Sequence, residues 1–436
     1  MPLVSPPLPR NRDFVLLETG LFLSNIGTGT ANIAYPLLVL AVTHSAAKTG
    51  VVSFAQFLPY VLFGLAAGVA ADRWQRKRLM VAADATRALA VGGLAALIAL
   101  HRLSLWTIII VGFVEGTGAV FYGAAHSGAF RAVVPRRQLS AAASTEEGRR
   151  AVQRLMAPPL GGALFGLGRA IPFILDAASY ACSTAAVLLM RTPFEEERKR
   201  AATHPWHDAV EGLRFVWANP FLRLTTLMFA LGNISSAGIQ ISIIIIARRQ
   251  GLSGTGVGAL VALVGATTLI GSLVSALVRR VLSARAILLS EFWAGLALVS
   301  FLVRPNAYVL GGAFAFQAFF FVNTDSTVAA YRYALTPDRL IARVTTGMFN
   351  VAVLATPLGP LAAGFLIGSV SPRAAVAGFL ALLLIALISG TLSKSTRGLP
   401  HPQTSPRPRR KPSCDLRFVA ERVRQETGGG AGRNRG

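Results

Sequence analysis

The stretch GVAADRWQRKRLM, from Gly68 to Met80, places one acid and four bases within seven consecutive residues of an otherwise apolar chain. No charged residue occurs between Val51 and Ala71, and a second apolar run follows the charged stretch. A long uncharged run is typical of a helix that spans a membrane, and a short basic loop is typical of the cytosolic side. The stretch therefore predicts a cytosolic loop between two transmembrane helices.

The composition also indicates a membrane protein. Of the 436 residues, 53% are hydrophobic and 14% are charged, whereas a soluble domain usually carries about 25% charged residues. The formal net charge of +24 would suggest a nucleic-acid partner for a soluble protein. Because aromatic residues are not interleaved with the bases of the tail, we expect no nucleic-acid partner. The two cysteines, Cys182 and Cys414, lie in an apolar run and in the polar tail, which excludes a disulfide framework.

Continuous apolar runs recur along the chain and predict an all-α membrane protein with twelve transmembrane helices in two six-helix halves. The runs reach the roughly 17 to 25 residues that a spanning helix needs, and they do not alternate with the period of two that is typical of strands. We expect the helices at 14–41, 49–71, 79–100, 104–130, 147–168, 170–190, 222–247, 254–278, 285–303, 306–330, 343–368 and 373–393.

The distribution of Lys and Arg predicts the topology. With the N-terminus in the cytosol, seven of the 43 basic residues fall on the outer side and 36 on the cytosolic side, 11 of them in the tail. Cytosolic loops carry the excess of Lys and Arg, so we expect a multi-pass protein of the cell inner (plasma) membrane with both termini cytosolic. The N-terminus lacks the apolar core of a cleavable signal peptide, so we expect the first helix to be retained.

These features divide the chain into four parts. We expect an N-terminal six-helix half at 1–190, a cytosolic linker at 191–221, a C-terminal six-helix half at 222–393, and a basic, disordered cytosolic tail at 394–436. Within the linker, apolar residues recur at helical spacing and predict an amphipathic helix, which lies in the membrane interface or simply joins the two halves. These residues are Trp206, Val210, Leu213 and Trp217.

A weak internal repeat supports the two halves. The stretch APPLGGALFG in the fifth predicted helix and GPLAAGFLIG in the eleventh share a proline and two glycines at one spacing of 202 residues. Duplicated six-helix units predict such matches in corresponding helices. The matched pairs are Pro158 with Pro360, Gly162 with Gly364, and Gly166 with Gly368.

With these motifs the sequence resembles the major facilitator superfamily. The loop after the second helix is similar to the signature Gly-x-x-x-Asp-Arg-x-Gly-Arg-Lys of that superfamily, with Gln75 where a glycine is usual. The matching residues are Gly68, Asp72, Arg73, Arg76 and Lys77. The resemblance covers about residues 14 to 393 and implies the major facilitator fold.

The fifth helix resembles the exporter signature Gly-Pro-x-x-Gly-Gly, in which Pro158, Gly161 and Gly162 match and Ala157 replaces the first glycine. The stretches EGLRFVWANPFLR, ILDAASY and TPDRLIARV are similar to a branch with siderophore exporters and macrolide efflux pumps. Two departures concern the coupling mechanism. Gly112 stands where proton antiporters place an arginine, and Thr28 where members of this branch often carry an acid.

Asp72 is the unusual residue of the basic loop. It lies at the C-terminal end of a helix, where the helix dipole disfavours an acid. We therefore expect a positive partner, either Arg131 or the start of the eleventh helix near Arg343. The resemblance to the superfamily implies that this contact ties the two halves together on the cytosolic side when the outer side is open. Gly68 would allow close helix packing. The alternative is that Asp72 only offsets the neighbouring bases.

Polar residues deep in the apolar helices are candidates for substrate contact or coupling. Their alternative role is hydrogen bonding between helices. Asp84 and Arg87 are three residues apart and predict an internal ion pair. For Glu18 and Asp325, which lie closer to the cytosolic end, a hydrated and merely structural role is the alternative. The cavity and coupling candidates are Glu115, Asn25, Asn233, Gln240, Gln317, Asn323 and Asp325, and Asp176 and Glu291 are weaker ones.

Glu115 is the strongest of these candidates, because a carboxylate in the middle of a membrane helix is expensive to ionise. It could hold a proton in one state of a transport cycle and release it in another. A cationic substrate would favour its ionised form and so allow exchange for a proton. The alternative is a carboxyl that stays protonated and hydrogen-bonded within the bundle.

Together these features predict a secondary active transporter, with proton-coupled efflux of a small amphipathic compound such as a drug, a siderophore or another natural product. The alternatives are an uptake permease of the same fold and a non-transporting membrane scaffold. No Gly-x-x-x-x-Gly-Lys phosphate loop occurs, so ATP is not expected as the direct energy source. An intramembrane enzyme is disfavoured because His126 is the only histidine in the apolar helices. We expect no cofactor or metal, a lipid bilayer around the helices, and a monomer.

Overall fold

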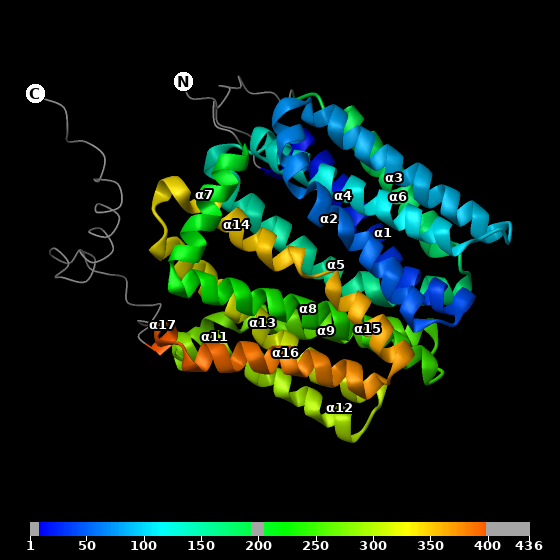
Figure 1. Cartoon of the computed structure of the whole chain (residues 1–436). Helices are drawn as coiled ribbons and strands as arrows, with labels where there is room; N and C mark the ends of the chain where they lie inside the picture. The colour runs from blue at the N-terminus through cyan, green and yellow to red at the C-terminus, as the bar shows by residue number, and fades with distance from the viewer. Residues whose placement is uncertain (1–7, 193–204, 398–436) are drawn as a thin grey trace, which may run out of the picture. The chain divides into compact units, whose positions relative to one another are not determined.

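The structure is a computed structural model that describes residues 8–192 and 205–397 (Figure 1). In these ranges the chain forms helices and no strand, which confirms the predicted all-α class. Eleven of the described helical segments are long and apolar enough to cross a membrane. The tail with Cys414 and the charged part of the linker at 193–204 lie outside the described residues.

The first six helices follow one another through short connections. Serine side chains cap the starts of the second and fourth, where Ser45 accepts from the Lys48 amide and Ser104 from the Thr107 amide. The helices are α1 (Arg12–Thr43), α2 (Ala46–Arg73), α3 (Arg76–Ala99), α4 (Leu105–Val133), α5 (Leu139–Leu167) and α6 (Ile171–Leu189).

The start of α1 is joined to the end of α6. The Asp13 carboxylate accepts hydrogen bonds from the backbone amides of Arg191 (3.1 Å) and Thr192 (2.6 Å). From the other side, the Lys77 ammonium donates to the carbonyls of Leu188 (3.0 Å) and Met190 (2.8 Å), which lack partners within the helix. Three helices of the first half are thus tied at one point.

The second half contains interrupted helices. The predicted spans 254–278, 285–303 and 343–368 are present as the spans Gly254–Leu273, Ala284–Val303 and Asp338–Ser369, but consecutive shorter helical segments cover these regions. The last is broken at Ala355 to Pro357, because a proline disfavours helical geometry in the residue before it. The segments are α7 (Pro205–Ala218), α8 (Pro220–Arg249), α9 (Gly254–Leu273), α10 (Ser275–Val281), α11 (Ala284–Ala294), the 3-10 turn η3 (Gly295–Leu298), α12 (Val299–Val303), α13 (Ala307–Leu335), α14 (Ile341–Leu354), α15 (Leu358–Ser369), α16 (Pro372–Leu392) and α17 (Lys394–Arg397).

α5 differs from its prediction. It begins at Leu139 rather than at 147, and it is not among the eleven apolar spans although it has 29 residues. Its first half carries two acids and three arginines: Glu146, Glu147, Arg149, Arg150 and Arg154. Such charges are tolerated at membrane depth only where they face protein or water, so this part of α5 must line an internal space.

Glycines bring the two halves together along two seams. At the first, α2 meets α15: a Cβ added to Gly50 would lie 2.6 Å from the Pro360 carbonyl oxygen and 3.0 Å from the Gly364 Cα. At the second, α5 meets α9, where a Cβ on Gly162 would collide with the Gly254 carbonyl. Gly50 and Gly254 stand near the starts of their helices, so both seams lie toward the end predicted to face outward.

α7 is the helix predicted in the linker. Val210, Leu213 and Trp217 are exposed, whereas Val216 is fully buried. Gly212 on the buried side packs against the backbone of Arg343 in α14, and Arg343 forms an ion pair with Glu211. The exposed apolar face suits a position in the membrane interface.

Candidate functional site

A polar cavity of about 680 Å³ lies among the first five helices. It extends from Arg131 in the last turn of α4 to Arg87 near the middle of α3, that is, from the predicted cytosolic end to the middle of the bundle. We call it the entry cavity. Its lining residues are Leu21, Ser24, Asn25, Thr28, Tyr60, Arg87, Ala119, Tyr122, Gly123, His126, Ser127, Phe130, Arg131, Glu146, Arg150, Gln153 and Arg154.

A second cavity of about 250 Å³ lies where both halves meet, between α1, α5, α8, α9 and α13. We call it the central cavity. It shares Gln153 and Arg154 with the entry cavity, and Pro158 of the predicted exporter motif also lines it. The other lining residues are Gly29, Asn32, Ile33, Ala157, Gln240, Ile243, Val261, Val264, Gly265, Thr268 and Phe314. An apolar pocket with a few convergent polar groups is the usual form of a small-molecule site.

Two of the predicted amides line these cavities: Asn25 the entry cavity and Gln240 the central cavity. Two others hold helices together instead. Asn233 donates to the Ala352 carbonyl (3.0 Å), and Asn323 donates to the Gly271 carbonyl (3.4 Å).

The remaining polar candidates of the second half line neither cavity. Gln317 is buried, and its amide has no hydrogen-bond partner among the described residues. Asp325 is exposed. Glu291 is buried on α11, away from both cavities, and one of its oxygens lacks a partner among the described residues.

Glu115 is buried among the helices of the first half rather than facing either cavity. Its carboxyl accepts a hydrogen bond from Tyr35 on α1 (2.8 Å) and one from Tyr180 on α6 (3.0 Å). Sequence reasoning missed both tyrosines, because a tyrosine within an apolar run resembles core packing. A substrate bound in either cavity would therefore contact the residues that line the cavity and not Glu115.

Arg87 connects Glu115 to the entry cavity. Its guanidinium forms the predicted ion pair with Asp84 (3.1 Å), which is confirmed, and it donates to the Tyr180 hydroxyl (2.6 Å). Tyr180 in turn donates to Glu115, and Arg87 itself lines the entry cavity. A continuous chain of charged and polar groups thus leads from the cavity wall to a buried carboxyl.

Asp176 belongs to the same group. Its side chain is fully buried, and it is close enough to Tyr180, Glu115 and Arg87 to interact with all three. Three carboxyls around one guanidinium would leave two negative charges uncompensated if all were ionised. Buried uncompensated charge is very costly, so binding of a proton would stabilise this buried carboxyl group (Asp84, Glu115 and Asp176 with Arg87).

Glu18 is also paired. The structural role considered for it is confirmed by this ion pair, but its side chain is buried and not hydrated. It is buried on α1 and forms an ion pair with Arg149 of α5. His126 lies 4.0 Å from its other oxygen. This pair anchors the charged half of α5 to α1.

The predicted gating residues lie apart in this structure. Asp72 and Arg73 are exposed, and Asp72 has no ion-pair partner in the described part of the chain. Arg131, its predicted partner, donates to the Ser127 carbonyl and lines the entry cavity. Nothing lies within 4 Å of a Cβ added to Gly68, so the predicted close approach is not formed.

Two further bases of the loop, Arg76 and Lys77, hold helix ends together. Arg76 packs its guanidinium on Gly128 of α4, and Lys77 binds the end of α6 as described above. The glycines of the exporter motif have packing contacts as well: Gly161 lies against the backbone of Thr30 in α1, and Gly162 against Gly254 in α9.

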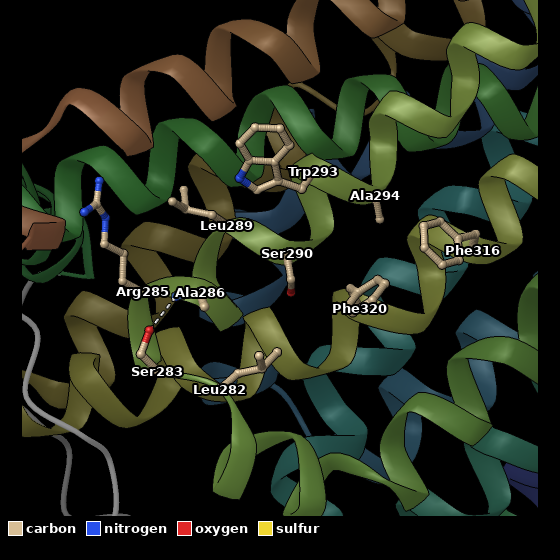
Figure 2. Close-up of a pocket in the computed structure, with 10 residues that line it drawn as sticks. All are labelled: Leu282, Ser283, Arg285, Ala286, Leu289, Ser290, Trp293, Ala294, Phe316 and Phe320. Atoms are coloured by element: carbon tan, nitrogen blue, oxygen red, sulfur yellow. Dashed lines mark hydrogen bonds between the residues drawn. The ribbon is translucent and has the colours of Figure 1, made fainter.

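A groove of about 630 Å³ on α11 and α13 is separate from both cavities (Figure 2). Figure 2 shows Ser283 and Arg285 toward one end and Phe316 at the other. Trp293 and Phe316 are 56% and 52% exposed, and none of the predicted site residues lines the groove. Exposed aromatic side chains on spanning helices suit contact with lipid. No group of three or more potential metal ligands occurs among the described residues.

Curated relatives of similar length are efflux proteins. The chain is 26% identical over 384 residues to "Multidrug efflux pump Tap" of Mycolicibacterium fortuitum, which covers 84% of this chain and 91% of that protein. It is 24% identical over 393 residues to "Enterobactin exporter EntS" of Citrobacter koseri, with 88% and 94% covered. "Macrolide efflux protein A" of Streptococcus pyogenes matches over 182 residues with 27% identity, covering 41% of this chain and 45% of that protein.

Solved structures with the same fold are transporters. A bacterial homologue of the iron transporter ferroportin, in an inward-facing state, has a TM-score of 0.69 at 16% identity and covers 88% of this chain and 99% of its own. A bacterial homologue of the lysosomal transporter Spinster, also inward-facing, has a TM-score of 0.67 at 18% identity, with 89% and 98% covered.

Like these relatives, the chain is a multi-pass membrane transporter and not an enzyme. A family model described as "Transmembrane secretion effector" matches residues 5–429. The chain therefore belongs to the transmembrane secretion effector family, within the major facilitator superfamily.

Proposed function

We propose that the chain is a proton-coupled exporter of small amphipathic compounds in the inner membrane, with both termini cytosolic. The observation that carries this proposal is the position of Arg87. It lines the entry cavity and contacts the hydroxyl of Tyr180, which donates a hydrogen bond to Glu115. A change of protonation at Glu115 or Asp176 alters the charge around Arg87 and therefore the wall of the cavity. Efflux relatives that align over most of the chain support the direction of transport.

The transport cycle follows from the seams and the cavities. The glycine seams lie toward the outer end, and the entry cavity reaches the cytosolic end, so this arrangement admits a compound from the cytosol. The halves at 1–190 and 222–393 then move as units, joined by the linker at 191–221. The seams separate, and the loop with Gly68, Asp72 and Arg73 closes the cytosolic side. Both cavities form within one chain, which supports a functional monomer.

The test uses the purified protein in liposomes and three probes with one fluorophore: dansyl acid, dansyl amide and dansylcadaverine. We expect at least one probe to accumulate against its gradient when only a proton gradient is imposed. In a Cys182→Ser background, labelling of Cys414 by an impermeant thiol reagent reports which way each protein is inserted. Accumulation of none of the probes, with oriented protein shown to be present, would contradict the proposal. Movement only toward the cytosolic face would indicate an uptake permease.

We expect Asp72→Asn to reduce transport at least tenfold while leaving insertion and substrate binding unchanged. Asp72 is exposed and has no ion-pair partner within 8–192 and 205–397 while the seams are closed. Its contact would therefore form only in the opposite state, which the substitution would depopulate. Transport rates and surface expression of Asp72→Asn would be compared with those of Asp338→Asn, a second exposed acid. Equal transport by the two variants would leave Asp72 with only a local charge effect.

A further inference from the structure

We propose that the exported compound is an organic anion whose acidic group binds Arg154 at the junction of the two cavities. This inference rests on the proposed export function and specifies its substrate class. It differs from the sequence-based hypothesis of a cationic substrate that interacts directly with Glu115.

Arg154 occupies an unusual position for a cation. It lies near the middle of α5, at membrane depth, and its side chain is half exposed to the space between the helices. Intramembrane ionisable residues that face a water-filled space mark substrate pathways. The only ion pair of Arg154 among the described residues is a 3.6 Å contact with Glu147, whose side chain is 65% exposed. Such exposed pairs are weak, so the guanidinium is available to a ligand.

The central cavity surrounds Arg154 with groups that suit an anion. Arg154 is the single charged residue among those that line this cavity. Three amides, Asn32, Gln153 and Gln240, add hydrogen-bond donors, and the remaining wall is largely aliphatic, with Phe314 as its aromatic residue. A carboxylate, sulfonate or phosphate can accept two parallel hydrogen bonds from a guanidinium. A cation in this cavity would meet no carboxylate.

The charges that line the entry cavity also favour an anion over a cation. Four arginines and one glutamate line it, and the glutamate, Glu146, is already paired with Arg150 (2.5 Å). A cleft lined by charges of one sign concentrates ligands of the opposite sign. Tyr60, Tyr122 and Phe130 provide aromatic faces beside the arginines, so a flat aromatic anion finds both charge and apolar contact along this path.

The anion and the proton would occupy separate sites. Arg154 lies on α5, whereas Glu115 is enclosed by α1, α4 and α6. Exchange therefore does not require direct competition between the two. It requires that binding of the anion and binding of the proton favour the same movement of the two halves. Arg87, which lines the entry cavity and contacts Tyr180, would connect the two sites.

The first test is equilibrium binding to the purified protein, followed by dansyl fluorescence. We expect dansyl acid to bind at least tenfold more tightly than dansyl amide and dansylcadaverine, which share its fluorophore. Arg154→Gln should weaken dansyl acid binding at least tenfold and change dansyl amide binding less than twofold. Arg154→Lys should retain the preference for the acid. Arg373→Gln, which removes an exposed arginine at the opposite, outer end, is the matched control and should change neither.

Every other order of affinities would overturn the inference. Tighter binding of dansylcadaverine, equal binding of all three probes, no binding of dansyl acid, or an unchanged preference in Arg154→Gln would each do so. The same probes in the transport assay separate this inference from the proposed function. Proton-driven transport of dansylcadaverine or dansyl amide without transport of the acid would refute the anion and leave the exporter standing, whereas transport of none would refute the exporter.

Discussion

Glu115→Gln is expected to abolish the accumulation of substrate that a proton gradient drives, while substrate binding stays within twofold of the unmodified protein. The amide has nearly the same shape as the carboxyl. Its oxygen can accept from one of the two tyrosines, and its NH2 group can donate to the hydroxyl of the other, so the packing around it should persist. The amide cannot take up or release a proton. A substitution that only damaged the fold would instead lower binding and expression together.

Proteoliposomes would be assayed in two modes, with an imposed proton gradient and in substrate exchange at equal pH. We expect Glu115→Gln to lose proton-driven accumulation and to retain substrate exchange at equal pH, as an uncoupled transporter would. Asp338→Asn, an exposed acid outside the membrane helices, serves as the control and should behave like the unmodified protein. Proton-driven accumulation by Glu115→Gln would remove Glu115 from the coupling mechanism and leave the carboxyl a structural role alone.

Gly162→Val is expected to reduce transport about tenfold or more by opening the seam between α5 and α9. A Cβ at this position would lie 2.8 Å from the carbonyl carbon of Gly254 and 3.2 Å from the Cα of Gly258. These are backbone atoms that cannot rotate away, and overpacking of this kind costs about 1–3 kcal/mol. The arrangement with closed seams would be depopulated accordingly, and the measurement is the initial rate of probe efflux from cells with matched expression.

Gly166→Val on the same helix is the matched control. Nothing lies within 4 Å of a Cβ added to Gly166, so this change has the same effect on helix propensity without the collision. We expect it to retain more than half of the transport rate. Equal losses in both variants would show that helix propensity, and not the seam, determines the effect.

The spanning helices were predictable because the apolar runs are long and the basic residues are concentrated in a few loops. The Asp84–Arg87 ion pair was predictable as well, because three residues along a helix place two side chains on one face. The breaks at Gly295 and Pro357 were not, because the apolar run continues without interruption through each of them. The start of α5 was placed too late because its charged first half does not resemble a membrane span.

The environment of Glu115 could not be derived from the sequence, since it depends on which helices enclose α4. The sequence located a carboxyl that is costly to ionise within a membrane helix. It gave no signal that Tyr35 and Tyr180 would donate hydrogen bonds to this carboxyl. Arg154 was equally hidden. Among the many basic residues of the cytosolic half, only the packing of α5 between both halves shows that it faces the cavities.

The binding of the α6 end by Asp13 and Lys77 has a consequence for biosynthesis. All the residues that form these hydrogen bonds lie at or before Thr192. The bonds can therefore form while the ribosome is still translating the linker. Domains of a long chain generally fold as units during synthesis, the N-terminal one first. We therefore expect the first six helices to assemble in the bilayer before α8 leaves the translocon, and to offer the nascent second half a finished surface on which to dock.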